Sequence, residues 1–211
     1  IQRSVPGYAT MIKMISVLAA EYVQPDSRCY DLGCSLGASS LALQRGISSP
    51  GCRIIAVDNS PDMLERARQQ LPPGTSTCPI ELVCADILDL EILDASMVVL
   101  NFTLQFIVPE RRLALLQSIH RALLPQGILV ISEKIRFADR EQELQQSRMH
   151  HAFKRANGYN DLEISQKRSA LENVIIPETI DQHRQRLSAA GFQRSDLWFQ
   201  CFNFVSLIAH R

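Results

Sequence analysis

Several features are missing from this 211-residue sequence, and each absence excludes a class of protein. Neither charge is in excess, with 22 basic and 22 acidic residues, so no overall positive field would gather nucleic acid. No apolar run approaches the length of a membrane span, and no signal-peptide pattern is present. We therefore expect a protein without direct nucleic-acid binding and without a membrane segment.

Disulfide and metal patterns are also missing. The six cysteines form no C-x-x-C pair and lie mostly in or beside apolar segments. This distribution indicates reduced, buried thiols in a cytoplasmic protein. His150 and His151 are adjacent but have no acid or cysteine partner at ligand spacing, so we expect no metal site.

The apolar segments that are present predict one α/β domain over residues 1–211. Hydrophobic residues make up 46% of the chain, enough for a sizeable core. Short apolar strands alternate with amphipathic helices, which is typical of a mostly parallel sheet. We expect strands at 29–32, 53–58, 80–84, 97–101 and 128–132, closed by an antiparallel pair at 195–199 and 202–209. We expect helices at 8–22, 61–70, 109–124 and 178–190.

Residues 136–177 depart from this rhythm. The segment is strongly charged and reads as helices with a turn near Asn157-Gly158. Because it follows the fifth strand, it is placed to cover the crevice of the sheet. We therefore predict a helical insertion that acts as a lid.

A glycine turn after the first strand is the main indication of a ligand. The sequence there is Asp31-Leu32-Gly33-Cys34-Ser35-Leu36-Gly37, and the next strand ends in Asp58. Such an acid can accept hydrogen bonds from both hydroxyls of a ribose. A dinucleotide fingerprint would need glycine where Ser35 stands, so the turn is poorly built for NAD. The spacing is typical of class I S-adenosyl-L-methionine (SAM) methyltransferases, and the alternative is a plain turn with glycines for packing.

Other candidate residues stand at the ends of the next strands. Asp86 is placed to bind an adenine amino group with Ile87 against the ring, or it is a solvated acid. Asn101 follows the fourth strand, at the edge where open α/β sheets bind ligands. Tyr8 is either a capping aromatic or a ligand contact. Arg168 in the lid is either a solvated helix residue or a bidentate carboxylate clamp.

Longer motifs carry a more specific resemblance. Residues 1–8, 31–37, 98–106, 149–159, 163–168 and 197–204 resemble the carboxy-S-adenosyl-L-methionine synthase family, which has a Rossmann-like class I SAM methyltransferase fold. The resemblance covers essentially the whole chain. It implies a seven-stranded, mostly parallel sheet with a C-terminal antiparallel pair and a helical insertion after the fifth strand.

The resemblance also implies a reaction and a site. SAM and prephenate would give carboxy-SAM and phenylpyruvate, and the product would serve wobble-uridine (cmo5U) modification of tRNA. The enzyme would be a cytoplasmic homodimer without a metal. Arg168 would hold the added carboxylate and act in catalysis. The residues implied to bind SAM or carboxy-SAM are Tyr8, Gly33, Cys34, Ser35, Asp58, Asn59, Asp86, Ile87, Asn101 and Arg168.

Two other functions stay open at this point. A conventional SAM-dependent methyltransferase acting on a small acid or on tRNA would share every SAM-binding residue and differ at the lid. A non-catalytic SAM-binding module would share them as well.

Overall fold

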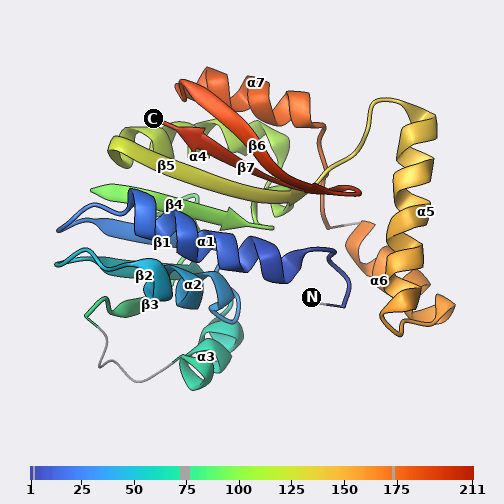
Figure 1. The fold of residues 1–211 in the computed structure, drawn as a ribbon, viewed down its shortest axis with the longest axis horizontal. Coiled ribbons are helices and arrows are strands. Elements are labelled where there is room, and N and C mark those ends of the chain that lie inside the picture. Colours follow the sequence, from blue (N-terminus) through green and yellow to red (C-terminus); the bar gives the residue numbers. More distant parts are fainter. Residues whose placement is uncertain (2, 72–76, 173) are drawn as a thin grey trace.

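The computed structural model describes residues 1, 3–71, 77–172 and 174–211, and it describes their side chains except those of 167–172. In these residues one seven-stranded sheet has the order β3-β2-β1-β4-β5-β7-β6 (Figure 1). Its strands are β1 (Arg28–Leu32), β2 (Arg53–Asp58), β3 (Ile80–Cys84), β4 (Ala95–Asn101), β5 (Leu123–Lys134), β6 (Arg194–Cys201) and β7 (Phe204–His210).

The pairing confirms the predicted fold class. Strands β1 to β5 are parallel to their neighbours, and β7 runs antiparallel to both β5 and β6. The helices are α1 (Tyr8–Tyr22), α2 (Ala38–Gly46), α3 (Pro61–Gln70), α4 (Pro109–Ala122), α5 (Arg140–Ala156), α6 (Asp161–Glu172) and α7 (Ile180–Ala190), with a 3₁₀ turn, η1, at Leu104–Phe106.

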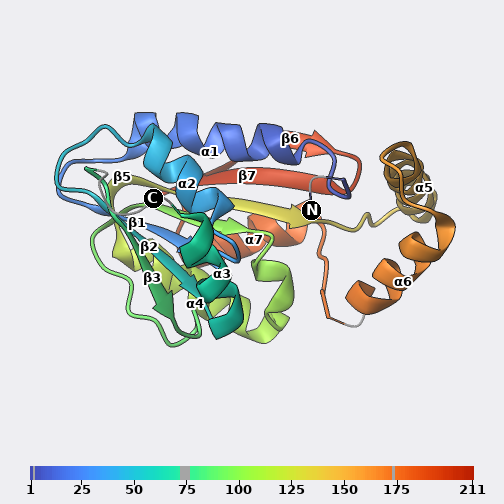
Figure 2. The same ribbon diagram turned by 90° about the horizontal axis from the view of Figure 1, so that it is seen from below.

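Helices cover both faces of the sheet, which explains why its central strands are almost continuously apolar. Met97 and Val99 of β4 pack in the core under α1 and α2, whereas Val98 and Leu100 pack in the core under α4 and α7. Figure 2 shows α1 and α2 on one side of the sheet and α4 and α7 on the other. Two buried layers therefore fix the strand ends that carry the candidate site.

The predicted insertion is a helical pair, α5 and α6, that stands beyond the end of the sheet (Figure 1). Asp139 caps α5 by accepting a hydrogen bond from the Gln142 N–H at 2.7 Å. The Arg3 side chain reaches the turn between the two helices, donating to the carbonyls of Asn157 at 2.9 Å and Gly158 at 2.8 Å. The N-terminal segment thus holds the outer corner of the pair.

Several boundaries differ from the predictions. Strand β5 begins at Leu123 instead of 128 and β4 at Ala95 instead of 97, and the strands of the C-terminal pair are 194–201 and 204–210. Two helix boundaries have a clear local cause. Helix α4 ends at Ala122 instead of Leu124 because Leu123 already pairs with Ala95, and an irregularity in the ladder separates that pair from Met97–Ile128. Helix α7 begins at Ile180 instead of Glu178 because Thr179 and Gln182 form a capping box. Within the described part of the chain, no helix is long and apolar enough to cross a membrane.

Candidate active site

A cavity of about 1200 Å³ opens at the carboxyl ends of the parallel strands, between the sheet and α5. This is the edge at which open α/β sheets bind ligands. Seven of the ten residues predicted to bind SAM line it: Gly33, Ser35, Asp58, Asn59, Asp86, Ile87 and Asn101. The structure therefore brings together residues that are up to 68 positions apart, from 33 to 101, in the sequence.

The glycine turn has to be glycine at its first position for two reasons. Gly33 has φ +81°, a conformation that L side chains rarely adopt, and a Cβ there would lie 2.5 Å from the Thr103 side chain. The N–H groups of Gly33 and Cys34 donate to the Val57 carbonyl at 2.8 and 2.9 Å. The turn is thereby fixed against the end of β2 and against the loop after β4.

Asp58 holds the same turn from the other side. Its Oδ2 accepts the Ser35 N–H at 2.9 Å, and its Oδ1 accepts the Ser60 N–H at 3.0 Å. An ionised carboxylate has about four acceptor positions, so each oxygen can accept one further hydrogen bond. Asp58 is therefore oriented by the protein and still able to bind ribose hydroxyls.

Two buried oxygens beside the turn have no partner among the described residues. Asp31 Oδ2 accepts the Ser40 hydroxyl at 2.6 Å, but its Oδ1 has no donor. Asn101 donates through Nδ2 to Ser39 Oγ at 3.0 Å, and its Oδ1 also has no donor. Burial raises the pKa of Asp31 to about 6, against the hydrogen bonds from Ser40 that lower it. Asn101 lines the cavity and Asp31 does not, so it is the unpaired acceptor of Asn101 that fits a cationic ligand such as SAM, which carries a sulfonium and an ammonium group.

Of the other three predicted residues, two do not line the cavity and the third has a side chain that the structure does not describe. Tyr8 is not among the lining residues and packs on Phe102, with ring centroids 6.4 Å apart. Cys34 is buried against Ala56 and Leu64, and burial raises the pKa of its thiol, which suits packing and not nucleophilic chemistry. Arg168 belongs to α6, but its side chain lies outside the described residues. A ligand contact by any of the three stays a prediction.

The lid side of the cavity carries residues outside the predicted set of SAM-binding residues. Lys134, His150, His151 and Lys154 all line it. His150 Nε2 lies 2.8 Å from the Ser4 carbonyl, and burial, together with the neighbouring lysines, lowers the pKa of His150 to about 4. The available signals were the position of Lys134 at the end of the fifth strand and the four-residue spacing of His150 and Lys154.

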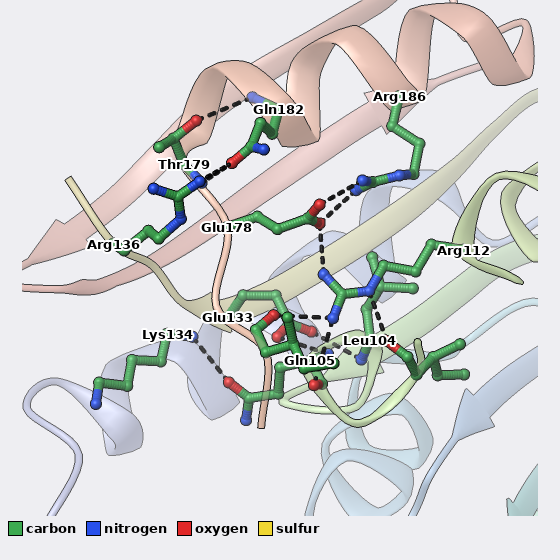
Figure 3. Close-up of polar contacts among 12 residues, drawn as sticks. Leu104, Gln105, Arg112, Glu133, Lys134, Arg136, Glu178, Thr179, Gln182 and Arg186 are labelled. Carbon is green, nitrogen blue, oxygen red and sulfur yellow. Dashed lines mark hydrogen bonds and ion pairs between the residues drawn. The ribbon is translucent and has the colours of Figure 1, made fainter. Parts of the chain in front are cut away.

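Behind the cavity wall lies a buried charged network, drawn in Figure 3. Glu133 accepts the N–H groups of Leu104 and Gln105 at 2.9 and 3.1 Å and so holds η1, which carries Gln105 into the cavity. Glu178 forms ion pairs with Arg112 and Arg186. Burial works to raise the pKa of Glu178, but the two guanidinium groups outweigh it and hold that pKa below its usual value.

Comparison with known proteins first shows which class of protein this fold belongs to. Residues 30–127 match the family described as a methyltransferase domain. Human N-acetylserotonin methyltransferase, solved in complex with SAM, superposes with a TM-score of 0.64 at 17% identity, covering 94% of this chain and 51% of that one. Magnesium protoporphyrin IX methyltransferase from Synechocystis, with bound SAM, gives 0.63 at 16% identity, covering 97% and 80%. The chain therefore has the class I SAM methyltransferase fold.

Relatives in sequence identify the family more narrowly than the fold does. The carboxy-S-adenosyl-L-methionine synthase of Geobacter sp. strain M21 is 60% identical over 212 residues, which cover 100% of this chain and 87% of the relative. The synthase of Yersinia pestis strain Pestoides F is 56% identical over 209 residues, covering 99% and 78%. The chain belongs to the carboxy-S-adenosyl-L-methionine synthase family and is an enzyme of that family.

Proposed function

We propose that the protein converts SAM and prephenate to carboxy-SAM, phenylpyruvate and water. Prephenate loses CO₂ and its ring hydroxyl, the hydroxyl leaves with a proton from the SAM methyl group, and the CO₂ joins that methyl carbon. The observation that carries the proposal is the composition of the cavity in a member of this family. Asp58 and Asp86 lie at one part of the wall and the cations Lys134 and Lys154 at another, so a nucleoside and an anionic substrate fit together.

In this proposal the strand ends hold SAM. Asp58 accepts the ribose hydroxyls, Asp86 and Ile87 bind the adenine, and Asn101 Oδ1 faces the positive charge near the sulfonium. A carbanion-like methyl group would be quenched by water, so the reaction needs a dry site. Phe102, Ile107, Ile175 and Phe204 supply apolar lining. Arg168 would meet the added carboxylate with two parallel hydrogen bonds.

The product would be the carboxymethyl donor for cmo5U formation in tRNA. We propose a cytoplasmic homodimer that needs no metal and does not itself bind tRNA. The balanced charge supports the absence of tRNA binding, and the six free cysteines support a reducing compartment. Exposed apolar residues on the lid that do not line the cavity, Met149 and Leu162, support a partner subunit.

A turnover assay tests the proposal. Purified protein is incubated with SAM and prephenate, phenylpyruvate is followed by absorbance, and the nucleoside product is analysed by mass spectrometry. We expect phenylpyruvate above the spontaneous decay of prephenate and a product heavier than SAM by one CO₂. Omitting SAM is the control, and it should abolish the excess phenylpyruvate. Absence of the carboxylated product would refute the proposal, and a methylated acceptor would favour a conventional methyltransferase.

A further inference from the structure

The lid side of the cavity contains a cationic pair that comes from two distant parts of the chain. Lys134 is the last residue of β5, and Lys154 lies in the last turn of α5. Both line the cavity, and Lys154 is only 6% exposed. Both lysines act on His150 and lower its pKa, after the larger effect of burial, so both ammonium groups lie near that imidazole.

One face of α5 brings Lys154 to this place. Glu143, Ser147, His150 and Lys154 follow a spacing of four, three and four residues, and all four line the cavity. Glu143 is engaged at the start of the helix, where its Oε2 accepts the Phe137 N–H at 2.8 Å. Eleven residues of helix place Glu143 about 16 Å along the axis from Lys154.

A buried amide lies next to Lys134. Asn203 lines the cavity, is 1% exposed and has no partner for its Oδ1 among the described residues. Its backbone carbonyl accepts the Ile135 N–H at 2.8 Å, which fixes it beside the end of β5. A buried side-chain oxygen without a donor is costly unless a ligand or a neighbouring group supplies one. That oxygen is an acceptor and cannot bind a carboxylate, but the Nδ2 group of the same amide is a donor that can bind a carboxylate or a ketone oxygen.

We infer that Lys134, Lys154 and Asn203 bind the 2-oxo acid end of the second substrate, the carboxylate that the substrate keeps. This rests on the proposed function. The choice between the two carboxylates of prephenate follows from charge. A cation paired with the departing carboxylate stabilises it in the ground state and loses the interaction as CO₂ forms, which raises the barrier. A cation paired with the retained carboxylate holds the substrate equally before and after that step.

Phenylpyruvate separates the two carboxylates, because it has the retained one and lacks the one that is transferred. We propose Lys154→Met and Lys134→Met, with Arg155→Met as the matched control. Arg155 is the next cation on α5, but its guanidinium is exposed and pairs with Asp161 at 2.8 Å. Calorimetry measures the dissociation constants of phenylpyruvate and of SAM, steady-state kinetics gives the KM for prephenate, and circular dichroism checks the fold.

We expect each lysine variant to weaken phenylpyruvate binding and to raise the prephenate KM at least tenfold, with SAM binding unchanged within about twofold. Arg155→Met should match the parent in all three. Unchanged phenylpyruvate binding in both folded variants would overturn the inference, even if the prephenate KM rose, because the cations would then bind the transferred carboxylate. If the parent makes no carboxy-SAM, the proposed function fails, and phenylpyruvate calorimetry still decides whether the subsite exists.

Discussion

Replacing Arg112 by methionine tests whether the buried network supports the cavity wall. The Arg112 side chain is completely buried, and its Nε and Nη2 donate to the carbonyls of Ile107 at 2.7 Å and Ile176 at 2.8 Å. Its Nη1 forms the ion pair with Glu178. The substitution would leave that carboxylate buried with Arg186 alone and would leave two carbonyls without their donor.

The expected loss can be worked out from these contacts. Removing one partner of a buried ion pair costs about 3–5 kcal/mol when the other charge is left unpaired, and because Glu178 keeps its pair with Arg186 we expect about 1–3 kcal/mol from this term. Each lost hydrogen bond to a carbonyl adds about 1 kcal/mol. We therefore expect Arg112→Met to lose about 3–5 kcal/mol of unfolding free energy. At about 2–4 °C per kcal/mol for a chain of this size, Tm would fall by about 6–20 °C.

Urea unfolding followed by circular dichroism and by the single tryptophan, Trp198, measures this loss. Arg111→Met is the control, because Arg111 is an exposed neighbour and its removal should change stability by no more than about 0.5 kcal/mol. The double variant Arg112→Met, Glu178→Gln should be less destabilised than the sum of the single changes, since the stranded charge is gone. A loss below about 1 kcal/mol, or strictly additive effects, would refute the role given to this pair.

Three further predictions concern the site. Asp58→Ala should weaken SAM binding at least about tenfold by calorimetry, because charge-assisted bonds to ribose contribute about 1.5–3 kcal/mol each. Asp62→Ala, at an exposed acid of α3, should bind like the parent, and equal affinities of the two variants would remove the ribose assignment. Arg168→Ala should reduce carboxy-SAM affinity by about 2–5 kcal/mol while SAM affinity stays nearly constant, and Arg168→Lys should recover only part; equal losses for both ligands would contradict the clamp. Burial raises the pKa of Glu133 from 4.5 to about 8, against the opposing effects of the Leu104 N–H and Arg112, so the folded state keeps a proton that the unfolded state loses. Between about pH 5 and 8 the free energy of unfolding therefore falls as pH rises, because only the unfolded state loses this proton. Urea midpoints of the parent should fall more steeply over this range than those of Glu133→Gln. Parallel profiles of the two proteins would contradict this assignment.

The sequence was sufficient to predict the strands and the edge of the sheet at which the candidate SAM-binding residues meet, because both are encoded locally. Apolar runs of five to seven residues between turn residues define β1 to β4. Parallel strands present their carboxyl ends at one edge, so Gly33, Asp58, Asp86 and Asn101 had to meet once the fold class was known. Local sequence did not reveal that Asp58 also ties the turn through Ser35 and Ser60, because those bonds depend on the loop conformation.

Arg112 shows why the buried network was not predicted. In the sequence it is one of two adjacent arginines on an amphipathic helix, a position normally read as solvated. Arg112 is buried because the segment just before α7 packs against it, and Glu178 in that segment, 66 residues later in the sequence, forms an ion pair with its guanidinium. Only the tertiary arrangement distinguishes Arg112 from Arg111.

The two lysines of the carboxylate subsite differ in how firmly the protein holds them. Lys134 lies in the sheet, where its backbone pairs with β7 and its N–H donates to Gln105 Oε1 at 3.3 Å. Lys154 is on α5, which is held to the rest of the protein through the His150 contact with the Ser4 carbonyl and through Arg3 at the outer turn. The subsite therefore requires both the packed sheet and the docked lid. The seven candidate SAM-binding residues that line the cavity lie at or just after the ends of β1 to β4, so we expect the position of the lid to affect binding of the second substrate more than binding of SAM.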